Sequence, residues 1–266
     1  MVREPAVAGQ FYAAEKKQLE ISLDDMIREC PEKIDAIGAV SPHAGYMYSG
    51  TVAGQVYGRL SPRDTYIILS PNHTGSGARF ALSTEPWRTP LGETGIDQDF
   101  ESVLLKKTAL LKKDADAHSR EHSIEVQLPF IQRISPQAKI VPITVKFSDL
   151  SESRELAEAI ASALVETGRS AVIIASSDMT HYETRESAAR KDHMAIQRML
   201  DIDPEGLLRT VEKMDISMCG YIPAAIMLLS AKKLGAKKTE LVRYTDSGGV
   251  TGDTSEVVGY AGIIVY

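Results

Sequence analysis

Three histidines in this 266-residue chain each follow a run of β-branched and other apolar residues, with small polar residues in between. Such apolar runs are typical of parallel strands that are buried on both faces of a sheet. Ligands of open α/β sheets bind outside the carboxyl ends of the strands, so the three histidines are expected to converge on one crevice. A metal site is the first hypothesis for that crevice. The histidines are His43, His73 and His181, after the runs at 36–40, 65–69 and 171–175.

Helical patterns alternate with these strands, which predicts a single α/β domain over residues 1–266 with a mostly parallel central sheet flanked by helices. The last two strands are expected to form a C-terminal antiparallel pair, joined by a glycine-rich hairpin loop rather than by an anion-binding nest. Strands are predicted at 36–41, 65–70, 79–83, 139–145, 171–176, 240–245 and 257–265, and helices at 15–28, 51–60, 97–107, 119–134, 151–166, 184–200, 204–213 and 220–234.

The overall charge and hydropathy exclude several classes of protein. A net charge of −6, a pI near 5.6 and the lack of a basic run argue against binding to nucleic acid or to an acidic membrane. No stretch approaches the roughly 20 apolar residues of a membrane span, and the first residues do not form a signal peptide. Two cysteines are too few for a disulfide framework. We therefore expect a cytoplasmic protein.

Proline and glycine surround two of the histidines. His43 lies in Pro-His-Ala-Gly-Tyr and His73 in Pro-Asn-His-Thr-Gly. Turns of this kind hold an imidazole in one orientation, which a metal ligand needs. A lone turn histidine more often bonds only to backbone, but two of them in equivalent places after successive strands favour the ligand interpretation.

The third turn contains an acidic residue, Asp178, three residues before His181. A carboxylate there can bond to a histidine ring and fix its tautomer, or it can be the N-cap of the following helix. For His181 we expect a functional role, as a third ligand or as a general base.

Cys219 stands where the last apolar helix begins. A helix N-terminus stabilises a thiolate, which makes the sulfur a better nucleophile and a better metal ligand. Simple packing of a small buried residue is the alternative. Cys30, which precedes a proline at the end of the first helix, is expected to be structural.

A second metal-binding pattern, His-x-x-Glu-His, spans His118, Glu121 and His122. On one helical face such residues bind zinc and supply a glutamate base in hydrolases. Here Ser119 reads as the cap of a helix at 119–134, which would leave His118 outside that helix. A solvated, charged helix start is the alternative.

These motifs together resemble the Memo family, whose fold is similar to that of class III extradiol dioxygenases. The resemblance spans nearly the whole chain and rests on the N-terminal Arg-Glu-Pro-Ala-Val-Ala-Gly-Gln-Phe-Tyr, the turns around His43 and His73, Glu-His-Ser-Ile-Glu at 121–125, Ser-Ser-Asp with His181, and Cys219-Gly220. It implies that His43, His73 and Cys219 are metal ligands. It further implies that Asp178 and His181 lie beside the metal and that His122 lines the pocket.

In the dioxygenases the third iron ligand is a glutamate, whereas here it is Cys219, so ring cleavage does not carry over. We expect a mononuclear iron or copper site, with zinc less favoured, that performs redox chemistry on a small substrate or oxygen. Two alternatives stand: a binding or scaffold protein that uses the same pocket for a peptide or partner, and a zinc hydrolase built on His118, Glu121 and His122. The resemblance also implies a radical-SAM partner protein.

Overall fold

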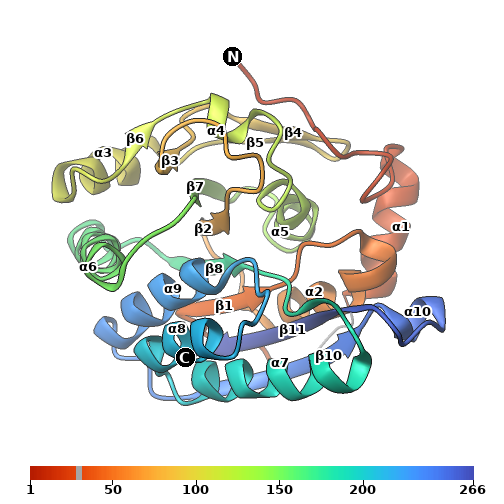
Figure 1. The fold of residues 1–266 in the computed structure, drawn as a ribbon. Coiled ribbons are helices and arrows are strands. Elements are labelled where there is room, and N and C mark those ends of the chain that lie inside the picture. Colours follow the sequence, from red (N-terminus) through yellow and green to blue (C-terminus); the bar gives the residue numbers. More distant parts are fainter. Residues whose placement is uncertain (28–31) are drawn as a thin grey trace.

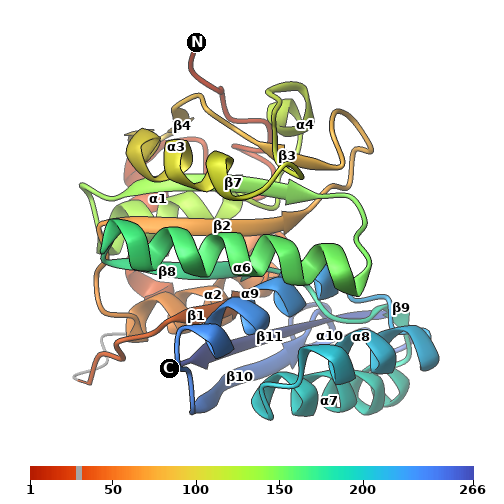
Figure 2. The same ribbon diagram turned by 90° about the vertical axis from the view of Figure 1, so that its left-hand side faces the viewer.

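A mixed β-sheet runs through the middle of the molecule, and helices lie against both of its faces (Figures 1 and 2). The computed structural model describes residues 1–27 and 32–266. In this part of the chain nine strands form the sheet in the order β10-β11-β1-β8-β2-β7-β3-β6, with β9 paired to β11 off this path. The strands are β1 (Gly38–Ser41), β2 (Thr65–Pro71), β3 (Phe80–Leu82), β6 (Lys112–Lys113), β7 (Lys139–Val145), β8 (Ala171–Ser176), β9 (His181–Glu183), β10 (Thr239–Asp246) and β11 (Val257–Val265).

The four central strands, β1, β8, β2 and β7, are parallel to one another. All seven residues of β2 are buried, as expected for a strand with helices over both faces. Within it, Ile67 pairs with Val141 on one side and with Ile173 on the other. Because these strands run in one direction, their carboxyl ends meet at the same edge of the sheet.

Two apolar clusters, one on each face of the sheet, form the core. Ile67 and Leu69 belong to the cluster that also contains apolar residues of α3, α6, α7, α8 and α9, whereas Tyr66 and Ile68 belong to the cluster that contains those of α1, α2 and α5. None of the helices in the described ranges is long and apolar enough to cross a membrane. The helices are α1 (Lys16–Met26), α2 (Tyr46–Arg59), α3 (Gln98–Lys107), α4 (Asp116–Ser119), α5 (Leu128–Ile134), α6 (Leu150–Thr167), α7 (Arg185–Leu200), α8 (Pro204–Lys213), α9 (Tyr221–Lys233) and α10 (Gly248–Thr251), with a 3-10 turn η1 (Glu125–Gln127).

The predicted fold class is confirmed: the chain is an α/β protein with a parallel centre in its sheet and helices on both sides. β10 and β11 form the predicted C-terminal antiparallel pair, and β11 attaches this pair to β1. Apart from the main sheet, β4 (Trp87–Thr89) and β5 (Gly92–Thr94) make a second antiparallel pair.

The single helix predicted at 119–134 is wrong. α4 ends at Ser119, and a non-helical link at 120–124 leads into η1 and α5. In this link the backbone N and the Oγ of Ser123 both donate to Glu121 Oε1, at 3.0 and 2.7 Å. Local bonds between side chain and backbone compete with helix formation. His118 therefore lies inside a helix, and Glu121 and His122 lie outside one, the reverse of the prediction.

Candidate metal centre

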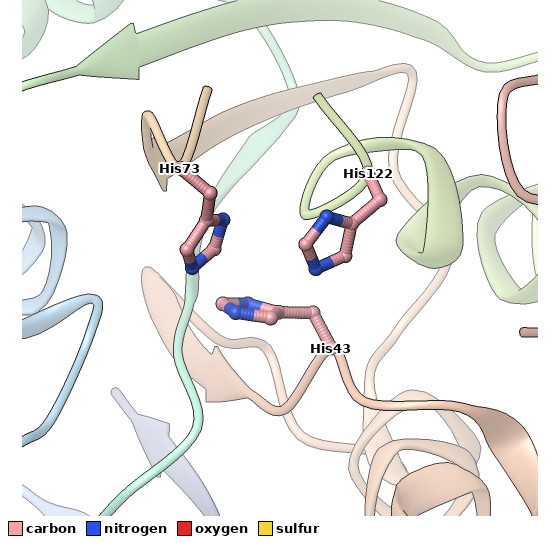
Figure 3. A group of neighbouring side chains, drawn as sticks. All are labelled: His43, His73 and His122. Carbon is pink, nitrogen blue, oxygen red and sulfur yellow. The ribbon is translucent and has the colours of Figure 1, made fainter. Parts of the chain in front are cut away.

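Three imidazoles from separate parts of the chain face one another at the carboxyl edge of the sheet (Figure 3). His43 follows β1, His73 follows β2, and His122 lies in the link before η1. One ligand atom of each lies within 4.8 Å of those of the other two. Because β8 alone separates β1 from β2 in the sheet, the parallel strands bring His43 and His73 together, as the sequence pattern indicates. We call these three residues the histidine cluster.

Cys219, the third ligand implied by the family resemblance, is not a member of this cluster. Its Sγ nevertheless lies 3.2 Å from Nε2 of His43. His122, predicted to line the pocket, is the third member instead. The ligand role of Cys219 stays a prediction, with His122 as a second side chain near the His43 ring.

Hydrogen bonds around His43 determine which ring nitrogen carries the proton. Ser176 Oγ donates to the carbonyl oxygen of Ser123 at 2.7 Å, since a carbonyl oxygen can only accept. Ser176 Oγ must therefore accept from His43 Nδ1, 2.9 Å away. The second nitrogen, Nε2, keeps its lone pair on the side of Cys219. Burial lowers the pKa of His43 well below its ordinary value, and the two neighbouring imidazoles lower it further, so the ring is neutral.

His73 is oriented by Glu121. The buried carboxylate accepts from the backbone N of His73 at 2.6 Å and from its ring Nδ1 at 3.0 Å. Burial opposes ionisation of Glu121, but its bonds to His73 and Ser123 hold its pKa well below the ordinary range. Burial alone would lower the pKa of His73, but the hydrogen bond from its ring to Glu121 and the charge of that carboxylate outweigh burial, so the net shift of the pKa is upward. Nε2 of His73 is thus left for a ligand, as in the carboxylate–histidine pairs of metal sites.

His122 is held less tightly than the other two. Its Nδ1 lies 3.6 Å from Glu121 Oε1, and its ring stacks on His73 with centroids 4.8 Å apart. Its ring also contacts Phe11, at a centroid distance of 4.8 Å. Burial lowers the pKa of His122, which favours the neutral form that binds metals.

Asp178 supports the His43 turn rather than the His181 ring. Its Oδ1 accepts from the backbone N of His43 at 2.8 Å and of Ala44 at 3.3 Å. The N-cap alternative is wrong, because β9 follows Asp178 and Thr184 caps α7. Burial raises the pKa of Asp178, and its bonds to the backbone of the His43 turn partly offset this.

His181 is oriented by Ser217. Its backbone N donates to Ser217 Oγ at 2.7 Å, and its ring Nδ1 donates to the Ser217 carbonyl oxygen at 2.9 Å. No hydrogen bond joins Asp178 to the His181 ring in the described residues: Asp178 Oδ1 binds backbone N–H groups of the His43 turn, and Oδ2 lies 4.0 Å from His43 Nε2. His181 stands outside the histidine cluster, and its acid–base role stays a prediction.

Cys219 lies just before Gly220, the N-cap of α9. The backbone N of Asp178 donates to its Sγ at 3.3 Å. Burial, with the charge of Asp178 added, raises the pKa of the Cys219 thiol. Desolvation therefore outweighs the helix N-terminus that was predicted to stabilise the thiolate. The other cysteine, Cys30, lies outside the described residues.

The His-x-x-Glu-His pattern is not assembled as a site. His118 is fully buried, its Nε2 donates to the carbonyl oxygen of Ala81 at 3.1 Å, and its ring packs edge-on against Trp87. Burial lowers the pKa of His118 to about 4. It is a core histidine, apart from the cluster that contains His122.

Sequence reasoning missed the residues that orient the rings. Ser176 and Glu121 belong to the motifs of the family resemblance, and Glu121 also to the hydrolase pattern, but the sequence gives neither an orienting role. Gln127 stands in none of these motifs, yet its Nε2 donates to Ser176 Oγ at 2.9 Å. The signal that could have found Ser176 is its position at the last residue of a buried parallel strand.

The comparisons with known proteins agree with these motifs. The sequence model of the family described as Memo-like protein matches residues 3–264. A MEMO1 family protein of Methanopyrus kandleri is 42% identical, and one of Methanosarcina acetivorans is 45% identical; each alignment covers 99% of both chains.

Among solved structures, an uncharacterized protein from Escherichia coli K12 is similar with a TM-score of 0.53, over 84% of this chain and 98% of that one. At 12% identity this likeness concerns the fold alone. Because the family model and the relatives match along almost the full length, the chain belongs to the Memo family.

Proposed function

We propose that the chain binds one transition-metal ion, iron or copper, at His43 and His73 and uses it for redox chemistry on a small organic molecule or on oxygen. The observation that carries this proposal is the orientation of the two rings. Ser176 and Glu121 engage the two Nδ1 atoms, so each ring presents Nε2. Neutral imidazoles oriented through the other nitrogen are common metal ligands.

Two side chains compete for the third ligand position. Cys219 is favoured by its contact with His43 Nε2 and by the family resemblance, and His122 is favoured by its place in the histidine cluster. A thiolate is a soft ligand that suits copper(I) and changes the potential of iron. Zinc fits the same donors but has no redox chemistry, so we favour iron or copper.

The surrounding residues bind and orient, and one of them can move a proton. When bound, the metal supplies electron transfer. His181 is our proposed acid–base: its Nδ1 is engaged by Ser217, which leaves Nε2 available. Asp178 holds the His43 turn through its backbone bonds. Ring cleavage is not proposed, since the glutamate ligand of the dioxygenases is Cys219 here.

A second candidate function is binding without catalysis. Met47 and Tyr182 are 67% and 74% exposed, and they follow His43 and His181 closely in the chain. Contiguous exposed apolar patches mark surfaces that bind a peptide or another protein, and these two side chains are the candidates for such a patch. The radical-SAM partner protein implied by the resemblance would bind to this surface.

Metal content tests the main proposal. Wild type, His43→Ala, His73→Ala and a control, His193→Ala, are purified anaerobically, loaded with iron(II) or copper(I) and analysed by mass spectrometry of the metal and X-ray absorption. His193 is an exposed histidine of α7. We expect metal in the wild type and control, loss of most of it in the other two, and oxygen uptake with ascorbate that follows the metal. Equal metal in all four proteins, or none in the wild type, overturns the proposal; bound metal without oxygen uptake or substrate turnover favours the binding function.

A further inference from the structure

The N-terminal segment, residues 3–12, lies against the link that carries Glu121 and His122. Arg3 is buried, and its guanidinium has three partners around this link. Nη2 donates to the Glu121 carbonyl oxygen at 2.7 Å, Nε donates to the His118 carbonyl oxygen at 3.1 Å, and Nη1 pairs with the carboxylate of Glu125. The Arg3 side chain thus binds the backbone at residues 118 and 121, on both sides of residues 119 and 120. It also binds the side chain of Glu125, the first residue of η1.

Glu125 ties the same segment to the link from the other side. Its carboxylate is fully buried and accepts from the backbone N atoms of Ala6 and Val7 at 2.8 and 3.0 Å and from Tyr12 Oη at 2.6 Å. Removing one partner of a buried, fully hydrogen-bonded ion pair leaves an uncompensated buried charge and strongly destabilises the protein. The contact between Arg3 and Glu125 therefore depends on the geometry of both side chains as well as on their charges.

Phe11 connects the segment to His122 and to the start of α2. Its ring lies 4.8 Å from that of His122, tilted by 57°. Its carbonyl oxygen accepts from the backbone N of Tyr46 at 2.7 Å, and Tyr46 begins α2 three residues after His43. The His122 ring has no hydrogen bond in the described residues, so its packing contacts are with the rings of Phe11 and of the other two histidines.

We infer that Arg3, Glu125 and Phe11 are positioning residues of the metal centre. They set the position of His122, and through the Glu121 backbone the position of the carboxylate that orients His73. The expected effect on metal binding rests on the proposed function, but the position of the His122 ring can be measured without metal.

The test compares Arg3→Lys and Phe11→Leu with Arg59→Lys. Lysine keeps the charge of Arg3 but cannot bond to two carbonyl oxygens and a carboxylate in one plane. Arg59 is a matched control: it also pairs with a glutamate, Glu240, and it ends α2 about 20 Å from the start of that helix. Phe11 is only half-buried, so its variant folds even if Arg3→Lys does not.

Two measurements are made on each protein. The affinity for cobalt(II), used as the probe, is obtained from its d–d absorption, and the imidazole ¹⁵N and ¹H resonances of His122 and His73 are recorded without metal. We expect about tenfold weaker cobalt binding in both variants, shifted His122 resonances, and neither change in Arg59→Lys.

The outcomes separate this inference from the proposed function. If the wild type binds no metal but the His122 resonances move in Arg3→Lys, which keeps the aromatic ring of Phe11, the positioning role stands and the metal function fails. If both variants keep wild-type resonances and wild-type cobalt affinity, the positioning role is overturned whatever the metal result. A shift of the His122 resonances of equal size in Arg59→Lys also overturns the positioning role, because the shift would then not depend on the contacts of Arg3 and Phe11.

Discussion

Glu121 binds His73 through both the backbone N and the ring Nδ1, at 2.6 and 3.0 Å. The glutamate side chain is fully buried, whereas the histidine side chain is 34% exposed. A buried, ionised acceptor therefore holds Nδ1 of a ring that is itself partly exposed. This pair joins the end of β2 to the link at 120–124, so the orientation of His73 depends on both.

Glu121→Gln should weaken metal binding by about tenfold to a hundredfold, the usual effect of removing a carboxylate behind a ligand histidine. The amide retains one acceptor oxygen but loses the charge that raises the pKa of His73. Affinity for iron(II) is measured by competition with a chelator, and the control is Glu240→Gln in β10, where Glu240 pairs with Arg59 at the end of α2. Equal affinities in the two variants would contradict an orienting role for Glu121.

Ser176→Ala should lower both stability and metal affinity. His43 Nδ1 and the Ser123 carbonyl oxygen lose their hydrogen bond to Ser176 Oγ, whereas Gln127 Nε2 loses one bond and keeps that to the Pro42 carbonyl oxygen. Unpaired buried groups cost about 1 to 3 kcal/mol in the free energy of unfolding, which urea denaturation measures.

Ser41→Ala is the matched control for this change. Ser41 pairs with Ser176 in the β1–β8 ladder and is equally buried, but its Oγ has no hydrogen-bond partner among the described residues. Its replacement should be nearly neutral. Similar losses in both variants would mean that the hydroxyl of Ser176 does not orient His43.

Cys219→Ser should reveal which side chain is the third ligand. If the thiolate binds the metal, cobalt(II) bound to the wild type shows a sulfur-to-metal charge-transfer band, and the band disappears in the variant along with most of the copper(I) affinity. His122→Ala should then keep the band. Loss of metal in His122→Ala, with an unchanged spectrum in Cys219→Ser, would instead assign the third position to His122.

The sequence was sufficient for the fold because its signals are local and strong. β2 and β8 are continuous apolar runs, and such runs have one stable place, the buried centre of a parallel sheet. From that placement the approach of His43 and His73 follows, since both histidines come directly after parallel strands close together in the sheet. The family resemblance supplied Cys219, which periodicity alone left undecided.

The link at 120–124 could not be predicted in the same way. Its conformation depends on contacts distant in sequence, such as those of Arg3 with the Glu121 carbonyl oxygen and of Glu121 with His73. A helical pattern is visible in the sequence, but bonds of this kind are not. The contacts of Asp178 could not be predicted for the same reason, because its partners at His43 and Ala44 lie more than 130 residues away.

His118 should make the protein less stable in mild acid. Burial lowers its pKa from the ordinary 6.5 to about 4, so between these values the unfolded chain binds a proton that the folded chain does not. Stability from this group is complete above pH 6.5 and is lost as the pH falls toward 4. Between pH 7 and pH 5 the loss is about 2 kcal/mol. His118→Gln keeps a donor for the Ala81 carbonyl oxygen but does not titrate, so urea unfolding at the two pH values should show a smaller decrease by that amount. An identical decrease in wild type and variant would show that His118 is protonated as readily in the folded protein as in the unfolded chain.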